Sequence, residues 1–180
     1  MGMGIMVCGL NGCGKSSVGR ALADKIGFHF IDNENLFFSG TDANEPYANP
    51  KSREEVEMLL MGEVQEHDDF VFAAVKGDYG KAIIPLYKCV ILIGVPKEIR
   101  LQRVRNRSFQ KFGNRMLAGG DLFEQEESFF KMIESRHEDY VENWVQTLNC
   151  PVIKIDGTKP VEENVEYIIK RINKLVYLKL

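Results

Sequence analysis

One stretch near the start of the chain has the spacing of a phosphate-binding loop: Gly9-Leu10-Asn11-Gly12-Cys13-Gly14-Lys15-Ser16 fits G-x-x-x-x-G-K-[ST] at every constrained position. Glycines let backbone N–H groups point at an anion, and a helix that follows such a loop adds its positive N-terminal end. Lys15 is expected to reach the outer phosphates, and Ser16 to place its hydroxyl on Mg²⁺, a cation that prefers oxygen ligands. The residues expected to contact the nucleotide here are Gly9, Asn11, Gly12, Cys13, Gly14, Lys15, Ser16 and Ser17.

Alternating strand-like and helix-like segments are available to position this loop. Apolar runs typical of buried strands lie at residues 3–8, 28–31, 70–75, 89–94 and 152–155. Between and after them, apolar residues recur at helical spacing over residues 17–26, 52–66, 97–105, 122–147 and 161–174. This alternation predicts an α/β fold with helices on both sides of a parallel five-stranded sheet, which is a three-layer α/β/α arrangement.

Two segments interrupt the alternation. Residues 36–50, with Gly40 and two prolines, are expected to be irregular. Residues 107–121 are rich in glycine and basic residues, lack clear periodicity and separate two predicted helices, so a mobile lid is expected there. We therefore expect one domain over residues 1–180, with a substrate-binding insertion at about 36–66 and a helical lid at about 107–124.

Composition excludes several classes of protein. The net charge of −3 leaves no basic excess to hold nucleic acid, so small-molecule phosphates are the expected ligands. No apolar run approaches the length of a membrane span and no charged-then-apolar leader precedes the loop, which predicts a cytoplasmic protein without a membrane partner. The four cysteines lack C-x-x-C spacing, so neither a disulfide nor a zinc site is expected, and Cys13 is interpreted as a small filler residue.

The loop, followed by an apolar strand that ends in Asp32, resembles the small-molecule kinases of the P-loop class, especially the adenylate kinase and shikimate kinase group. The resemblance extends over nearly the whole chain. It implies ATP and Mg²⁺ as cofactors, a P-loop NTPase fold and an arginine-rich lid. Asp32, with Glu34 two residues later, is similar to the D-x-D that ends the second strand of shikimate kinases. Asp32 would hold Mg²⁺ through water or take a proton from the attacking hydroxyl; the alternative is a solvated helix cap.

Three further positions resemble acceptor-binding elements of these kinases. Arg53 lies where a phosphate- or carboxylate-gripping arginine is found, although an arginine in the first turn of a helix is as often a surface charge. Asp78 lies in Lys76-Gly77-Asp78-Tyr79-Gly80, which matches neither relative's turn; it would bond acceptor hydroxyls or belong to a plain turn. Arg136 lies in a stretch similar to the Glu-Arg-x-x-x-Tyr that follows the lid, and is a second candidate for an anion.

The arginines around residue 105 resemble lid arginines. Arg103 and Arg107 share a helix face at i and i+4 and are expected to act on the transferring phosphoryl group, whereas Arg100 and Arg105 are expected to be solvent-exposed charges. Thr158 and Lys159 follow the last strand, where relatives surround adenine; a strand-to-helix turn explains them equally well.

Together these features predict an ATP- and Mg²⁺-dependent phosphotransferase acting on a small acceptor. A nucleoside monophosphate is slightly favoured, because Arg53 and Arg136 could grip its phosphate. The alternatives are a metabolite hydroxyl, as in shikimate kinase, and a nucleotide-dependent switch that hydrolyses ATP slowly.

Overall fold

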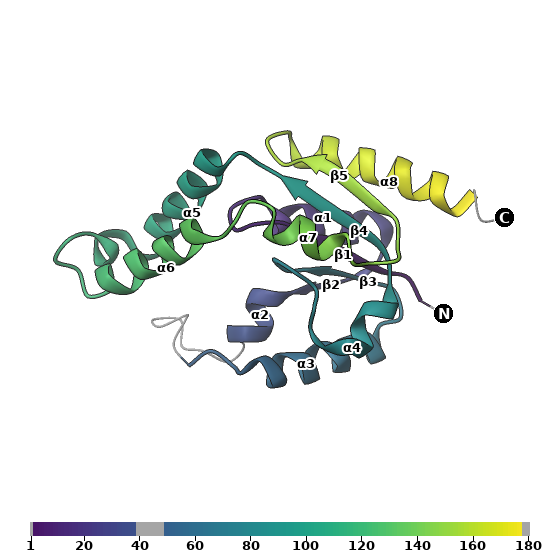
Figure 1. Cartoon of the computed structure of the whole chain (residues 1–180), viewed down its shortest axis with the longest axis horizontal. Coiled ribbons are helices and arrows are strands. Elements are labelled where there is room, and N and C mark those ends of the chain that lie inside the picture. The colour runs from purple at the N-terminus through teal and green to yellow at the C-terminus, as the bar shows by residue number, and fades with distance from the viewer. Residues whose placement is uncertain (1, 39–48, 178–180) are drawn as a thin grey trace.

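Five parallel strands form the centre of the molecule. The structure, a computed structural model, describes residues 2–38 and 49–177. Its sheet has the order β2-β3-β1-β4-β5 (Figure 1). The strands are β1 (Gly4–Cys8), β2 (His29–Asp32), β3 (Phe70–Ala73), β4 (Tyr87–Gly94) and β5 (Val152–Asp156). All four pairings are parallel, which confirms the predicted α/β fold.

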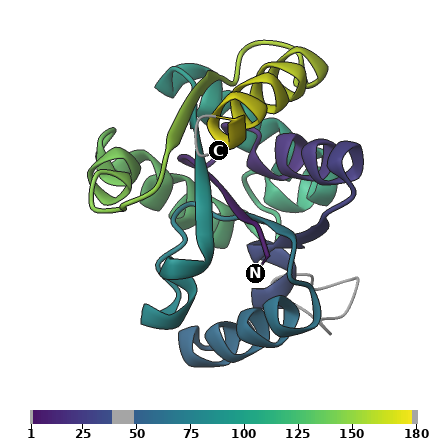
Figure 2. The same cartoon turned by 90° about the vertical axis from the view of Figure 1, so that its right-hand side faces the viewer.

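Helices cover both faces of this sheet because successive strand residues point to opposite sides. Along β1, Ile5 and Val7 pack in one core with α1 (Lys15–Ile26) and α8 (Val161–Tyr177). Met6 and Cys8 belong to the other core, which includes side chains of α3 (Arg53–Glu66), α4 (Gly80–Ile83) and α7 (Tyr140–Val145). Figure 2 shows α1 and α8 together on one side of the sheet and α7 on the other. A short 3₁₀ turn, η1 (Ile84–Leu86), connects α4 to β4.

Helix ends follow the local sequence signals. Gly14 has φ 95° immediately before α1, and Gly27 has φ 73° and donates its N–H to the carbonyl of Ala23 at the end of α1; both are left-handed conformations that glycine adopts without strain. Ser52 and Glu55 form the predicted capping box at the start of α3, each side chain bonding the other's backbone N–H. These ends position the phosphate loop and helix α3.

A helical arm extends from the sheet beyond the carboxyl end of β4 (Figure 1). We call it the α5–α6 arm: α5 (Lys97–Phe112), the 3₁₀ turn η2 (Gly113–Met116) and α6 (Phe123–Ser135). The expectation of an unpacked segment after Arg107 is wrong here, because α5 continues to Phe112, about one and a half more turns. A small core of Val104, Met116, Phe130 and Ile133 joins the two helices. The arm is therefore a packed unit with its own apolar centre.

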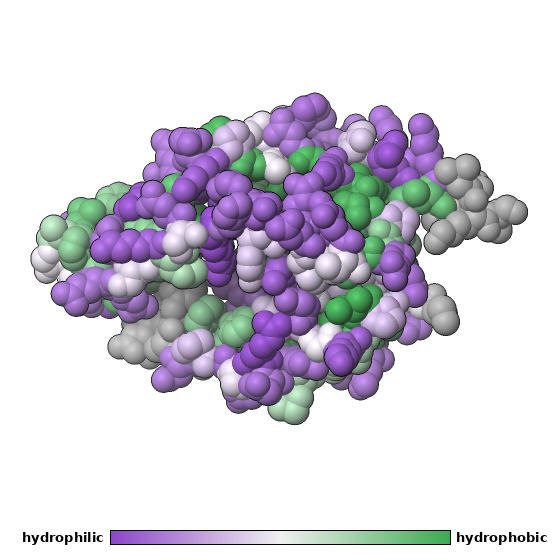
Figure 3. All heavy atoms as spheres, in the orientation of Figure 1, coloured by the Kyte–Doolittle hydropathy of each residue, from purple (hydrophilic) through white to green (hydrophobic). Residues whose placement is uncertain are grey.

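Two other segments differ from expectation. Residues 36–38 are helical, as part of α2 (Asn33–Phe38), whereas residues 39–48 of the predicted irregular stretch lie outside the described residues. The single helix predicted over 122–147 is two helices, because the chain turns at residues 136–139 and brings Glu138 to Arg100. Within the described ranges, no helix is both long and apolar enough to span a membrane. On the face seen in Figure 3, hydrophilic side chains predominate and apolar ones gather at the outer end of the α5–α6 arm.

Candidate functional site

The phosphate loop lies between β1 and α1, and a cavity of about 420 Å³ opens beside it. Asn11, Gly12, Lys15 and Ser16 line this cavity. The other loop residues with expected contacts do not: Cys13 is 1% exposed and belongs to the apolar core, as expected for a filler, and Gly9, Gly14 and Ser17 are absent from the lining. The loop side of the cavity is thus formed by Asn11 and Gly12, in the middle of the loop, and by the first turn of α1.

Glycine is required at position 12 for two separate reasons. Its backbone angle φ is 83°, a value that residues other than glycine rarely adopt. A Cβ atom here would also lie 2.3 Å from the backbone carbonyl oxygen of Arg100 on α5. The loop therefore touches the base of the α5–α6 arm directly, and Lys15 closes its inner side by donating from Nζ to the Leu10 carbonyl at 3.3 Å.

Asp32 ends β2 at the same edge of the sheet. Its Oδ1 accepts a hydrogen bond from the Glu34 backbone N–H at 2.9 Å, and its side chain lines the cavity together with Ser16. Carboxylate and hydroxyl oxygens are the ligands that Mg²⁺ prefers, and it binds proteins through one or two such groups plus substrate phosphates. Ser16 and Asp32 therefore fit a magnesium ion carried with a nucleotide.

The side chains of Arg107 and Arg103 contact different parts of the molecule, although the two residues share a helix face. Arg107 lines the cavity, with its Nη1 3.8 Å from the Glu34 carboxylate. Arg103 instead donates from Nη1 to the Gly157 carbonyl at 2.9 Å. The expected arginine pair thus divides between the phosphate cavity and the loop after β5.

That loop also carries the predicted adenine-pocket residues. Thr158 donates from both its backbone N–H and its hydroxyl to Asp156 Oδ1, at 2.9 and 2.6 Å, and this hydrogen bonding lowers the pKa of Asp156. Lys159 pairs with Glu163 at 2.7 Å, and neither Thr158 nor Lys159 lines the cavity. The structure brings Arg103 to the same loop, outside the phosphate cavity.

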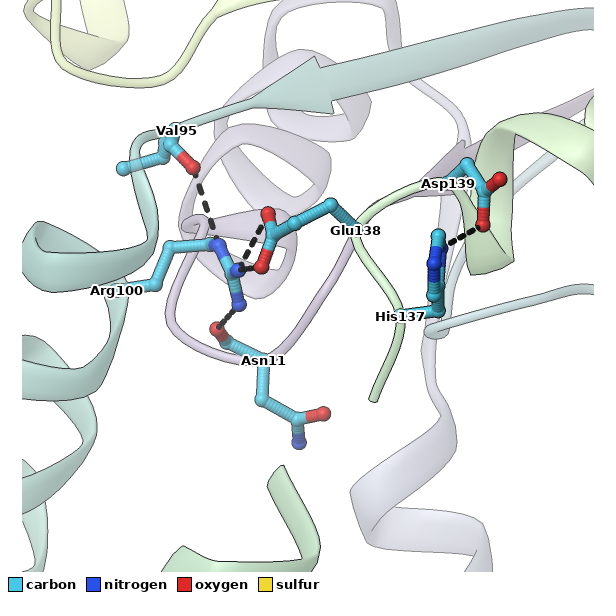
Figure 4. A network of polar contacts seen from close by, with 6 residues as sticks. All are labelled: Asn11, Val95, Arg100, His137, Glu138 and Asp139. Carbon is cyan, nitrogen blue, oxygen red and sulfur yellow. Dashed lines mark hydrogen bonds and ion pairs between the residues drawn. The ribbon is translucent and has the colours of Figure 1, made fainter. Parts of the chain in front are cut away.

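Arg100 is not the exposed charge that was expected. Its side chain is 4% exposed and donates hydrogen bonds to the carbonyls of Val95 and Asn11 and to both carboxylate oxygens of Glu138 (Figure 4). The spacing argument failed because it counted only the lid-facing side of α5, whereas the inner side packs on the phosphate loop. Arg105 is half-exposed as expected, paired with Glu127 and lying over the Phe130 ring.

The three expected acceptor-binding residues lie outside the cavity lining. Arg53 donates from Nη2 to the Asp78 backbone carbonyl at 2.5 Å and lies 3.3 Å from the Asp78 carboxylate. Lys76 pairs with the same carboxylate at 3.1 Å. Burial alone would raise the pKa of Asp78, but hydrogen bonds and charges from Lys76 and Arg53 outweigh it and the pKa is lowered. Arg136 donates from Nη1 to Asn11 Oδ1 at 2.5 Å.

The opposite wall of the cavity consists of residues that the sequence analysis did not select. Helix α2 contributes Asn33, Phe37 and Phe38, and α6 contributes Gln125, Glu126 and Phe129. Glu126 is 3% exposed, and one oxygen of its carboxylate has no hydrogen-bond partner within residues 2–38 and 49–177; the same holds for Asn33 Oδ1. A signal was present for Glu126, because it precedes Phe130 and Ile133 by four and seven residues and so occupies the buried face of α6.

A second polar cluster lies away from this cavity. The ligand atoms of His29, Glu63 and His67 all lie within 4.8 Å of one another, and the two imidazole rings stack at 3.7 Å. His29 Nε2 is 2.6 Å from the Glu63 carboxylate. None of the three lines the cavity, so this cluster is separate from the nucleotide site.

The topology and the loop define the class of protein. A parallel sheet with a glycine-rich phosphate loop after its central strand, and with further site residues at the carboxyl ends of neighbouring strands, is the P-loop α/β arrangement. The chain belongs to the AAA domain family AAA_18, which matches residues 5–115. It is also 27% identical over 173 residues to the uncharacterized protein YqaC of Bacillus subtilis (strain 168), a match that covers 92% of this chain and 94% of YqaC.

Solved structures of similar fold are small-molecule P-loop kinases. Shikimate kinase from Aquifex aeolicus vf5 matches with a TM-score of 0.62 and 17% identity, covering 97% of this chain and 98% of that one. A gluconokinase from Sinorhizobium meliloti 1021 has a TM-score of 0.57 and 16% identity, covering 98% and 97%. Deoxyadenosine kinase from M. mycoides has a TM-score of 0.57 and 14% identity, covering 96% and 100%. The fold is that of a P-loop kinase, which implies nucleotide binding, and these matches leave the acceptor open.

Proposed function

We propose that this protein is an ATP- and Mg²⁺-dependent phosphotransferase that moves the γ-phosphoryl group of ATP to a small acceptor. One observation carries the proposal: Lys15 and Ser16 at the start of α1, Asp32 at the end of β2 and Arg107 on α5, from three different segments, line one cavity at the carboxyl edge of the sheet. Phosphoryl transfer needs little from a protein beyond positioning and charge stabilisation. A cavity that combines a phosphate loop, two cations and a carboxylate supplies both.

In this proposal the loop N–H groups and Lys15 hold the phosphates of the donor. Ser16 and Asp32 hold the magnesium ion, which when bound neutralises phosphate charge. Arg107, on the α5–α6 arm, stabilises the negative charge of the transferring group. Arg103 holds the nucleobase end of ATP together with Thr158 and Lys159, a role supported by its hydrogen bond to the Gly157 carbonyl.

The α5–α6 arm is proposed as the lid and residues 36–66 as the acceptor-binding segment. Arg107 and Phe129 of the arm line the same cavity as Phe37 and Pro50. Closure of such an arm would exclude water while the phosphoryl group is transferred.

The acceptor is a separate question. A nucleoside monophosphate or a carboxylate-bearing metabolite needs a cation for its anionic group. Arg53 and Arg136, expected to supply one, do not line the cavity, and they are hydrogen-bonded to Asp78 and Asn11 respectively. The kinases of similar fold are named for three different small molecules, gluconate, shikimate and deoxyadenosine, so the fold alone supports no single acceptor.

The test measures ATP turnover with Mg²⁺ in the presence and absence of an acceptor panel of nucleosides, nucleoside monophosphates and small hydroxy acids. Strong stimulation by one class, with formation of its phosphorylated product, is expected. Hydrolysis that is independent of every acceptor would instead support a nucleotide-dependent switch. Absence of ATP binding by calorimetry with Mg²⁺ present would refute the proposal.

A further inference from the structure

Two hydrogen-bond acceptors in the cavity wall formed by α2 and α6 have no partner among the residues that the structure describes. One is a carboxylate oxygen of Glu126 on α6 and the other is the side-chain oxygen of Asn33 on α2. Both residues line the cavity, and Glu126 is 3% exposed. Buried polar atoms in native proteins almost always have partners, since an unpaired one loses its hydration without compensation. These two oxygens therefore favour a ligand that donates hydrogen bonds to them.

The charges of the cavity oppose an anionic acceptor. Among the described residues that line it, the carboxylates are Asp32, Glu34 and Glu126, against two cations, Lys15 and Arg107. The proposed phosphotransfer uses both cations for the phosphates of ATP. Residues 39–48 add no lysine or arginine to the sequence between α2 and Pro50. A phosphate or carboxylate on the acceptor would thus lie next to carboxylates of the same charge. Like charges in contact across a binding site disfavour binding strongly.

The apolar part of the wall is aromatic. Phe37 and Phe38 on α2 and Phe129 on α6 line the cavity, and aromatic rings favour stacked or edge-on contact with other flat rings. The cavity volume of about 420 Å³ lies within the usual range for small-molecule sites. Flat apolar surface next to hydrogen-bond acceptors matches a nucleobase, which has two aromatic faces and N–H groups at its edge.

We infer, resting on the proposed phosphotransfer, that the acceptor is an uncharged nucleoside, with its base against the phenylalanines and its N–H or hydroxyl donors on Glu126 and Asn33. The nucleoside's primary hydroxyl oxygen forms the new bond to the γ-phosphorus, and the bond from that phosphorus to the β,γ-bridging oxygen breaks. The hydroxyl proton is released to water. The products are a nucleoside monophosphate, ADP and a proton, so atoms and charge balance.

The experiment compares each common ribo- and deoxyribonucleoside with its own 5′-monophosphate, and includes gluconate and shikimate as hydroxy acids. Phosphorylated products are quantified by mass spectrometry, and nucleoside binding without ATP is measured by calorimetry. At least one nucleoside is expected to exceed its monophosphate in kcat/KM by about tenfold or more, the effect of avoiding a like-charge contact.

Glu126→Gln tests the proposed contact, because it removes the charge and keeps the shape. It is expected to weaken nucleoside binding and lower kcat/KM by about tenfold or more, as for a lost charge-assisted hydrogen bond. The preference over the monophosphate should shrink as well. Glu124→Gln is the matched control, since Glu124 is exposed on the same helix and does not line the cavity; it should behave as wild type.

The outcomes separate the two proposals. Faster phosphorylation of a monophosphate, gluconate or shikimate than of any nucleoside would overturn the inference and leave the phosphotransferase intact. ATP binding without phosphorylation of any nucleoside would overturn it too, as would a Glu126→Gln variant with unchanged nucleoside binding and unchanged preference. Failure to bind ATP would refute the phosphotransferase itself.

Discussion

The two walls of the cavity are built in different ways. The phosphate-loop wall comes from one continuous segment. Hydrogen bonds to backbone carbonyls hold it in place: Lys15 donates to the carbonyl of Leu10, and the buried Arg100 of α5 donates to the carbonyls of Asn11 and Val95. The opposite wall comes from side chains of α2 and α6, which are about 90 residues apart in the sequence. It contains two buried oxygens that have no hydrogen-bond partner in the part of the chain that the structure describes.

Under the proposed function, this difference means that the phosphate-loop wall, or nucleotide wall, is preorganised, and that the wall of α2 and α6, or acceptor wall, is completed by its ligand. Backbone groups fixed before binding favour the charged transition state without rearrangement. Side chains on a separate arm can differ between proteins while the phosphate chemistry stays the same. Substitutions in the first wall should therefore affect transfer to every acceptor, and those in the second should affect which acceptor is used.

Lys15→Ala is expected to have the largest effect. Removing the ammonium group from the outer phosphates should lower kcat by ~100-fold or more for every acceptor, the size seen when a transition-state charge contact is removed. Kinetics with several acceptors measure this, and circular dichroism checks the fold. Lys25→Ala, at an exposed position near the end of the same helix, is the control. A loss confined to one acceptor would contradict the division between the walls.

Arg100→Ala tests whether the nucleotide wall is held in place by the base of the arm. The side chain is 4% exposed while its partner Glu138 is 56% exposed and can return to water. We therefore expect a loss of about 2–3 kcal/mol in the free energy of unfolding, less than when both charges are buried. Urea denaturation measures it, with weaker ATP binding as a second readout. The half-exposed Arg105→Ala should cost under about 1 kcal/mol; equal losses would refute the anchoring role.

Most of the fold could be predicted because its signals are local. Buried strands give continuous apolar runs, Gly27 ends α1, and the pair Ser52 and Glu55 begins α3. The expectation for the arm was wrong because charged residues dominate α5, and its apolar centre of Val104 with Met116, Phe130 and Ile133 forms only when α5, η2 and α6 pack together. Periodicity within one segment cannot reveal such a core.

The candidate site divides in the same way. The phosphate loop was predictable because backbone geometry requires its glycines, and position 12 has both φ 83° and a close approach to the Arg100 carbonyl. Asp32 was predictable from its place after a strand. Asn33 and Glu126 were not selected, because their importance depends on two segments far apart in the sequence lining one cavity. Arg53 and Arg136 were selected by type, and only the fold reveals their partners.

Arg103→Ala is expected to change the use of ATP without changing the use of the acceptor, and so it tests whether the two walls act separately. Its guanidinium bonds the Gly157 carbonyl and does not line the cavity, so we expect KM for ATP to rise by several-fold to about tenfold, as for one hydrogen-bonding contact, with little change in kcat. The KM for the acceptor should stay the same, measured at saturating ATP. A large fall in kcat would mean that Arg103 reaches the transferring phosphoryl group after all.

Asp78→Asn should have the smallest effect, and its pH dependence identifies the cause. Lys76 and Arg53 hold the pKa of Asp78 below its ordinary value, against the opposing effect of burial. A group whose pKa is depressed in the folded state adds stability above its unfolded pKa of about 3.9, and this stability is lost as the pH falls through the folded pKa. With the side chain 29% exposed, the variant should lose about 1 kcal/mol or less of its free energy of unfolding at pH 7.

Urea unfolding should show that this loss of stability shrinks as the pH falls toward 3. The control variant Asp24→Asn, at an exposed position on α1, should show no loss of stability. A loss of stability that persists in acid would mean that packing, and not charge, joins this turn to α3. A fall in the rate of phosphoryl transfer as large as that of Lys15→Ala would instead make Asp78 part of the nucleotide wall.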